Sequence, residues 1–154
     1  MSDVLCIYYS FSGNTRRAMK EIAQQLDAEI VAIDDGADRN GFSGFMSAGR
    51  DAMRRSTAPL KPFTTEKPIE EYKMVIVGSP VWAGRCSSPI RGLLKRRGLE
   101  MSRVSYVITR SGTRPVRVYT IRWISTPRKS ICSMCLSNPE VWATPFGAIS
   151  LSVT

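Results

Sequence analysis

The stretch VLCIYYSFSGNTRRAMKEIA, residues 4–23, joins an apolar run to an amphipathic segment through a short polar loop. The run at 4–9 is rich in β-branched and aromatic side chains, which predicts a strand buried on both faces. After the loop, apolar residues gather on one helical face: Ala18, Met19, Ile22, Ala23 and Leu26. This spacing predicts a helix that begins at about Asn14 or Thr15 and covers a sheet.

Further strands are predicted where short apolar runs recur: EIVAID (29–34), KMVIVGS (73–79) and VSYVIT (104–109). Between the last two, SPIRGLLKRRG (88–98) predicts a helix with Pro89 in its first turn and Gly98 after its end. Strands that alternate with helices predict an α/β fold with a parallel, doubly wound sheet. We expect the first four strands in the order 2-1-3-4.

The long connection at 35–72 contains a weaker helical pattern, GFMSAGRDAMRR (44–55). Its apolar residues are expected to face inward: Phe45, Met46, Ala52 and Met53. Neither an internal repeat nor a linker divides the chain, so we expect residues 1–154 to form one domain, with 114–154 as an atypical tail.

Composition narrows the class of protein. The 154 residues are 43% hydrophobic and 23% charged, which is typical of globular proteins. No apolar stretch approaches the ~20 residues of a membrane span, and no signal-peptide pattern begins the chain, so a cytoplasmic location is expected. In that compartment the four cysteines are expected to be free thiols. The chain has no histidine, which excludes Ser-His and Cys-His nucleophile pairs and favours chemistry supplied by a cofactor.

The charge is basic, with 22 Lys and Arg against 13 Asp and Glu. The basic residues are scattered, with dense spots only at 16–17, 54–55 and 95–97, and no nucleic-acid-binding motif is present. A basic surface favours anionic partners in general, but this pattern argues against a nucleic-acid partner.

The polar loop at 10–15 has the composition of a phosphate site. A helix N-terminus offers unpaired N–H groups and a partial positive charge. Hydroxyl, amide and glycine residues crowd this one: Ser10, Ser12, Gly13, Asn14 and Thr15. Together they predict a cradle for a phosphate monoester. The alternative is an ordinary N-cap by Ser12 or Asn14, which would need only one such residue.

A second loop, GSPVWAGRCSSP (78–89), follows the third predicted strand, and TRSGT (109–113) follows the fourth. Ligands of open α/β sheets bind beyond the carboxyl ends of the strands, so these loops should border the cradle. Trp82 offers a flat apolar face to a ring system, the alternative being a partly buried core tryptophan.

YYSFSGNTRRAMKEIA (8–23) resembles the phosphate-loop signature of the flavodoxin-like family, and IVGSPVWAGR (76–85) is similar to that family's second flavin-contacting loop. The resemblance covers residues 1 to about 113. It implies a flavodoxin-like fold with strand order 2-1-3-4-5 that binds FMN without a covalent link and transfers one or two electrons through it. The implied contacts fall in three loops: Ser10, Phe11, Ser12, Gly13, Asn14 and Thr15 for the phosphate; Pro80, Val81, Trp82, Ala83 and Gly84, then Thr109, Arg110, Ser111 and Gly112, beside the isoalloxazine.

The basic charge departs from the family, whose electron-shuttling members are typically acidic. This difference favours a quinone- or flavin-reductase-like oxidoreductase over a pure electron carrier. The electron acceptor is then a small molecule or a redox partner protein. The alternative function is a degenerate or non-redox module of the same fold that binds a phosphate ester or nucleotide.

The tail after Gly112 also departs from the family, which continues with a helix, a strand and a closing helix. Residues 113–154 have poor helical periodicity and almost no acidic residues, although SICSMCL (130–136) could form a strand. A shift of reading frame is our hypothesis, because back-translation from the third base of the Arg122 codon permits Met-Asp-Gln-Tyr. The pair Cys132-x-x-Cys135 lacks the further ligands of a zinc site and is interpreted as incidental, and no metal site is predicted.

Overall fold

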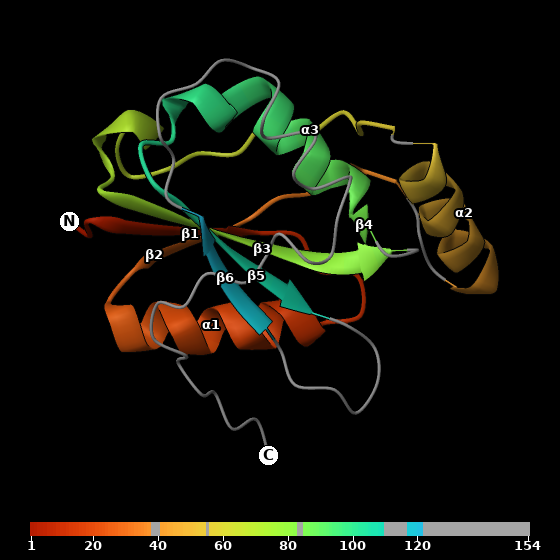
Figure 1. Cartoon of the computed structure of the whole chain (residues 1–154), viewed down its shortest axis with the longest axis horizontal. Helices are drawn as coiled ribbons and strands as arrows, with labels where there is room; N and C mark the ends of the chain where they lie inside the picture. The colour runs from red at the N-terminus through yellow and green to blue at the C-terminus, as the bar shows by residue number, and fades with distance from the viewer. Residues whose placement is uncertain (38–40, 55, 83–84, 110–116, 122–154) are drawn as a thin grey trace.

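The computed structural model describes residues 1–37, 41–54, 56–82, 85–109 and 117–121. In Figure 1 the strands form one layer, with α1 on one face and α3 on the other. The elements in chain order are β1 (Val4–Tyr8), α1 (Asn14–Leu26), β2 (Glu29–Ala32), α2 (Gly41–Met53), the 3-10 turn η1 (Ile69–Glu71), β3 (Met74–Trp82), β4 (Arg85–Cys86), α3 (Ser88–Arg97), the 3-10 turn η2 (Gly98–Glu100), β5 (Val104–Thr109) and β6 (Arg117–Ile121). No helix within these ranges is long and apolar enough to cross a membrane.

The sheet has the order β2-β1-β3-β5-β6, with β4 paired to β3 outside this path. The pairings β1–β2, β1–β3 and β3–β5 are all parallel, so the predicted order of the first four strands is confirmed. Helix α3 also begins and ends as predicted, with Pro89 in the first turn and Gly98 as its C-cap.

The last described strand differs from the expectation. β6 pairs antiparallel with β5, with Arg117 opposite Ile108 and Ile121 opposite Val104. The resemblance implied the order 2-1-3-4-5 in a parallel sheet, and β6 does lie beside the fourth predicted strand, but it runs in the opposite direction. The segment RVYTI is rich in β-branched and aromatic residues, and an antiparallel return needs no crossover helix.

The core lies in two layers because strand side chains alternate between the faces of the sheet. On β1, Cys6 and Tyr8 face α1 and pack with Met19 and Ile22. The alternate β1 residues pack on the other face, in one cluster with residues from α3 and from the η1 region: Leu5, Ile7, Tyr9, Ile69, Tyr72, Ile90, Leu93 and Leu94. β1 is therefore buried on both faces, as its continuous apolar run predicts.

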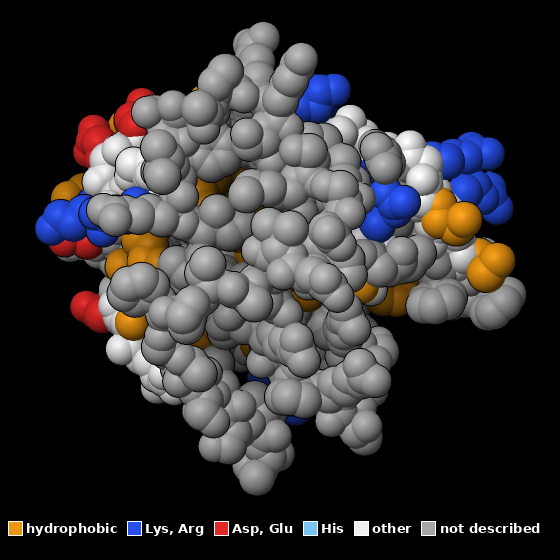
Figure 2. Space-filling view, viewed as in Figure 1, with side chains coloured by type: hydrophobic (Ala, Val, Ile, Leu, Met, Phe, Trp, Pro, Cys, Tyr) orange, Lys and Arg blue, Asp and Glu red, His pale blue; other side chains and the backbone are white. Residues whose placement is uncertain are grey.

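Three inward positions predicted from spacing are wrong. Leu26 is exposed because a residue eight positions along a helix of 3.6 residues per turn lies about 80° away from the first one. Met46 and Met53 are exposed, whereas Ala48 of α2 is buried. α2 lies at one end of the molecule, and only a narrow side of this helix faces the rest of the chain. Figure 2 shows hydrophobic and basic side chains gathered over that end. The side chains of Phe45 and Ala52 lie outside the described residues.

Gly78 fixes how closely α1 approaches the sheet. A Cβ atom at this position would lie 2.6 Å from Met19 Cγ and 2.8 Å from Tyr8 Cβ. Because both neighbours are fully packed core residues, they have no room to withdraw.

Replacing Gly78 with alanine is expected to lower the free energy of unfolding by about 1–3 kcal/mol, because the added methyl overpacks the core. The matched control is Gly49→Ala on α2, where a Cβ would meet nothing within 4 Å. That variant should gain up to about 1 kcal/mol through helix propensity. Urea unfolding of both variants checks this, and equal effects of the two substitutions would contradict it.

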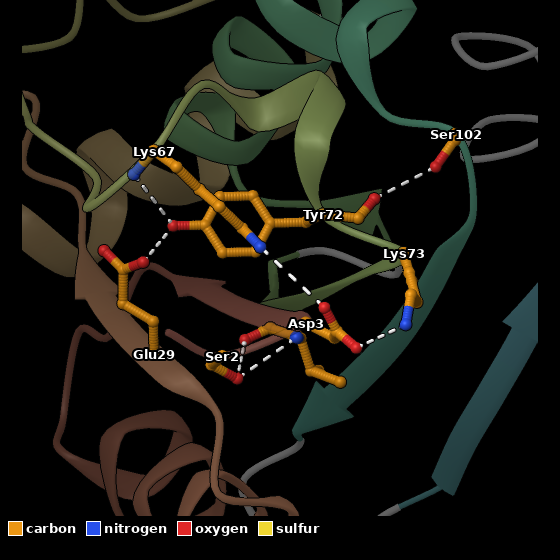
Figure 3. A network of polar contacts seen from close by, with 8 residues as sticks. Ser2, Asp3, Glu29, Lys67, Tyr72, Lys73 and Ser102 are labelled. Carbon is orange, nitrogen blue, oxygen red and sulfur yellow. Dashed lines mark hydrogen bonds and ion pairs between the residues drawn. The ribbon is translucent and has the colours of Figure 1, made fainter.

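A polar network joins the amino ends of the strands (Figure 3). The Tyr72 hydroxyl donates to a Glu29 carboxylate oxygen and accepts from the Lys67 N–H. The other Glu29 oxygen accepts from the Glu66 N–H at 3.0 Å, and Asp3 pairs with Lys73 at 2.6 Å. The network ties the segment before β3 to the starts of β1 and β2, at the edge opposite the loops that follow the strands.

Burial and the adjacent Glu29 raise the pKa of Tyr72 to about 12. A raised pKa in the folded state means that the stabilisation is complete below the unfolded pKa of about 10 and is lost as pH rises toward 12. In Tyr72→Phe we expect the decline of unfolding free energy between pH 10 and 12 to be shallower by up to about 1.4 kcal/mol per pH unit. Chemical unfolding at pH 9, 10 and 11 measures this slope, and identical slopes for both proteins would refute the assignment.

Candidate functional site

Three loops begin at the carboxyl edge of the sheet, where β1, β3 and β5 end. Tyr8 pairs with Gly78, and Pro80 with Thr109, so these strand ends are neighbours. The Tyr9 N–H also donates to the Gly78 carbonyl at 3.1 Å, which continues the contact beyond the end of β1. The three loops predicted from the sequence therefore begin side by side.

The first loop turns sharply into α1 through Gly13, which has φ +89° and lies next to the first helical residue. A non-glycine residue would be strained at this φ. The Ser10 Oγ accepts hydrogen bonds from the Gly13 N–H at 3.1 Å and from the Arg16 N–H at 3.2 Å. Because both acceptor positions of this oxygen are used, its own O–H is left to donate elsewhere.

The N-cap residue of α1 is Gly13, which makes no side-chain cap, so the alternative of an N-cap by Ser12 or Asn14 is wrong. The Ser12 Oγ instead accepts from the Asn14 amide at 3.2 Å, and both side chains are exposed. Within the described part of the chain, the backbone N–H groups of Asn14 and Thr15 form no hydrogen bond. Two unpaired donors thus stand at the positive end of the helix dipole.

Thr15 joins the first loop to the end of β5. Its Oγ1 lies 2.7 Å from the Oγ1 of Thr109, and the two residues are only 1% and 4% exposed. The structure therefore brings Thr109 to the start of α1. Arg16 and Arg17, one turn into the helix, are exposed.

The second loop brings Trp82 against the first one. Its ring centroid is 5.6 Å from that of Tyr9 and 6.1 Å from that of Phe11, both in edge-to-face geometry. The indole is 7% exposed and belongs to the core cluster on the α3 face. A ring system could stack on the indole only after the atoms that cover the indole are displaced. β4 then turns back on β3, with Arg85 opposite Trp82.

Arg91 is a residue that the sequence reasoning missed. It lies in α3, is 3% exposed, and donates to the carbonyls of Ser56 at 3.0 Å and Cys86 at 3.2 Å. It thereby ties the second loop to the segment after α2. A single basic residue on a mostly buried helix gives no distinguishing signal, because arginine usually lies at the surface.

In the part of the chain that the structure describes, two buried donors near the second loop have no hydrogen-bond partner: Arg85 Nη1 and Arg91 Nε. Of the predicted site residues, Ser10 to Thr15, Pro80 to Trp82 and Thr109 converge on this edge. The others lie outside the described residues: Ala83, Gly84, Arg110, Ser111 and Gly112.

Neither of the described cysteines, Cys6 and Cys86, is part of a disulfide, as expected. Burial raises the pKa of Cys6 to about 11, so this thiol stays protonated and unreactive near neutral pH. The described residues include no group of Cys, Asp and Glu arranged to hold a metal ion. Cys132, Cys135 and the remainder of the tail after Ile121 lie outside the described residues.

No protein-family model and no curated protein sequence matches this chain. Solved structures do match its fold. A flavoprotein from Lactobacillus acidophilus NCFM, crystallised in complex with FMN, is 23% identical with a TM-score of 0.62, over 73% of this chain and 78% of that chain. Its apo form, solved by NMR, is 24% identical with a TM-score of 0.55, over 75% and 78%.

A protein described as a flavoprotein from Bacteroides eggerthii DSM 20697 is 20% identical with a TM-score of 0.57, over 73% of this chain and 74% of that chain. These likenesses confirm the predicted flavodoxin-like fold.

Replacing Arg91 with methionine is expected to lower the free energy of unfolding by about 1–3 kcal/mol, because two partly buried carbonyls lose a hydrogen bond from a buried guanidinium. Arg91→Lys keeps the charge but not the two-pronged contact, so it should lie between methionine and the native protein. Urea unfolding measures the series. A methionine variant as stable as the native protein would show that burial of the cation offsets its hydrogen bonds.

Proposed function

We propose that the chain binds FMN without a covalent link and acts as a redox protein through it. The observation that carries the proposal is the set of unpaired donors at the start of α1: the N–H groups of Asn14 and Thr15 and the spare O–H of Ser10. They are held in a flavodoxin-like fold, and one protein of that fold was crystallised with FMN.

A phosphate fits this position both electrostatically and sterically. The donors lie at the positive end of a 13-residue helix whose first turn contains no acidic residue. A Cβ at Gly13 would meet nothing within 4 Å, so the backbone there is open to close approach. An anion in this cradle would satisfy groups that no described residue satisfies.

The ring pocket would be made by the second loop, with Pro80, Val81 and Trp82, and by the residues after β5. The orphaned donors Arg85 Nη1 and Arg91 Nε suit the carbonyl oxygens of an isoalloxazine. When bound, the flavin would supply one- or two-electron transfer, and the protein would tune it by packing and hydrogen bonds.

The basic charge of +9 supports a reductase-like role over a carrier that docks on a basic redox partner. We therefore favour an oxidoreductase that passes electrons to a small acceptor such as a quinone or a second flavin, in the cytoplasm. A redox partner protein with an acidic docking surface is the alternative acceptor.

A second candidate function is a phosphate-ester or nucleotide-binding module without redox activity. The burial of Trp82 favours it, because the phosphate cradle has unpaired donors while the indole face is covered. Under this hypothesis the phosphate group would be recognised and the flavin ring would add nothing to the affinity.

The test is a titration of the purified chain with FMN and with riboflavin, followed by flavin absorbance and fluorescence. We expect FMN to bind at least about tenfold more tightly, because only FMN carries the phosphate. No spectral change with FMN at millimolar concentration would reject the proposal. Protection against unfolding by inorganic phosphate and AMP, without any advantage for FMN, would establish the second candidate.

A variant pair locates the phosphate. Ser12→Ala should weaken FMN about three- to tenfold while leaving riboflavin unchanged, because a hydroxyl bound to an anion is removed. Ser43→Ala, on an exposed position of α2, is the control and should change neither affinity. An equal loss for both ligands in the Ser12 variant would contradict the placement.

A further inference from the structure

We propose that Thr109 is a positioning residue for the phosphate cradle at residues 10–15. Its hydroxyl acts by donating a hydrogen bond to the Thr15 hydroxyl. The proposal rests on FMN binding and assigns Thr109 a different place from the ring pocket that the family resemblance implies. It starts from the buried hydroxyl pair, whose oxygens are 2.7 Å apart.

The pair carries one more proton than its single hydrogen bond uses. Each threonine hydroxyl has one proton to donate, and one of the two is consumed between the oxygens. Neither side chain has another hydrogen bond in the described part of the chain, so one buried O–H is left without an acceptor. Leaving a buried donor unpaired is unfavourable by about 1–3 kcal/mol. We therefore expect a bound ligand to supply the missing acceptor.

The direction of the internal bond decides which threonine donates to the ligand. Thr15 lies in the first turn of α1, beside the unpaired N–H groups of the cradle, whereas Thr109 ends β5 behind it. If Thr109 donates to Thr15, the Thr15 proton remains for the anion at the helix start. A hydroxyl that accepts a hydrogen bond is also polarised into a better donor.

Strand alternation places Thr109 on the phosphate side of the sheet. Residues two apart on a strand share a face, so Thr109 lies on the same face as Val107, which packs with Met19 of α1. Trp82 belongs to the cluster on the other face, with Tyr106 of β5. The Thr109 side chain therefore points toward α1 and away from the indole.

A threonine at this position is otherwise unfavourable. The α1 face of the sheet around it is apolar, and valine has the same shape without a hydroxyl to desolvate. If the hydrogen bond between Thr15 and Thr109 served only to hold α1 against β5, both residues could be replaced by valine at little loss of stability. A positioning role for Thr109 and a purely structural link between α1 and β5 therefore predict different effects on ligand binding.

The experiment measures FMN and riboflavin affinities of the full chain with Thr109→Val, Thr15→Val, the double variant and Thr109→Ser. We expect Thr109→Val to weaken FMN about tenfold and leave riboflavin unchanged, with serine restoring most of the loss. Thr15→Val should lose more. In the Thr15→Val background, Thr109→Val should have no further effect, since its route to the phosphate is already gone.

Three results would overturn the inference. An equal loss of FMN and riboflavin affinity in Thr109→Val would place the residue at the ring or mark a general defect, which urea unfolding of the apoprotein would show. Unchanged FMN affinity with altered stability would mean that the pair of threonines only links α1 to β5. Additive losses in the double variant would mean that Thr109 contacts the ligand independently. If the native chain binds no FMN, the proposed function itself fails, and the variants are not needed to show it.

Discussion

The packing of β1 between two parallel neighbours determines where everything else lies. Its side chains alternate between two apolar clusters, so both faces must be covered, α1 covering one and α3 the other. Because β2 and β3 run in the same direction as β1, the carboxyl ends of the strands share one edge. The loops after β1, β3 and β5 therefore begin at the same edge as a geometric result of the pairing, and no long-range interaction between loops is required.

The two edges of the sheet are built differently. At the amino edge the polar groups are paired with one another, as in the contacts of Tyr72, Glu29 and Asp3 (Figure 3). At the carboxyl edge several donors lack a partner among the described residues, including two N–H groups of α1 and Arg85 Nη1. N–H groups at the start of a helix are ordinarily free for a cap, water or ligand, whereas a buried unpaired donor such as Arg85 Nη1 is rare in a folded protein. This asymmetry, more than any single residue, distinguishes the edge that holds the candidate site from the edge that holds the fold together.

Sequence reasoning succeeded where a local pattern has one physical meaning. The run at 4–9 is apolar throughout, and only a strand covered on both faces explains it, which gave the centre of the sheet. It failed where tertiary contacts decide: the exposure of Met46 and Met53 depends on how little α2 touches the rest of the chain. The buried role of Arg91 and the pairing of Thr15 with Thr109 join residues distant in sequence, and no spacing rule links them. β6 was missed because the tail after Gly112 was interpreted as atypical, and the local β propensity of 117–121 was not weighed.

The antiparallel direction of β6 limits how many strands end at the carboxyl edge of the sheet. A fifth parallel strand would end at that edge and add its own loop beyond β5. β6 instead runs back, so that Ile121 stands beside Val104 at the amino edge. Within the described residues, the parallel strands β2, β1, β3 and β5 end at this edge, and no parallel strand ends beyond β5. A ligand held at the start of α1 would therefore lie against the ends of β1, β3 and β5 and not against a fifth parallel strand.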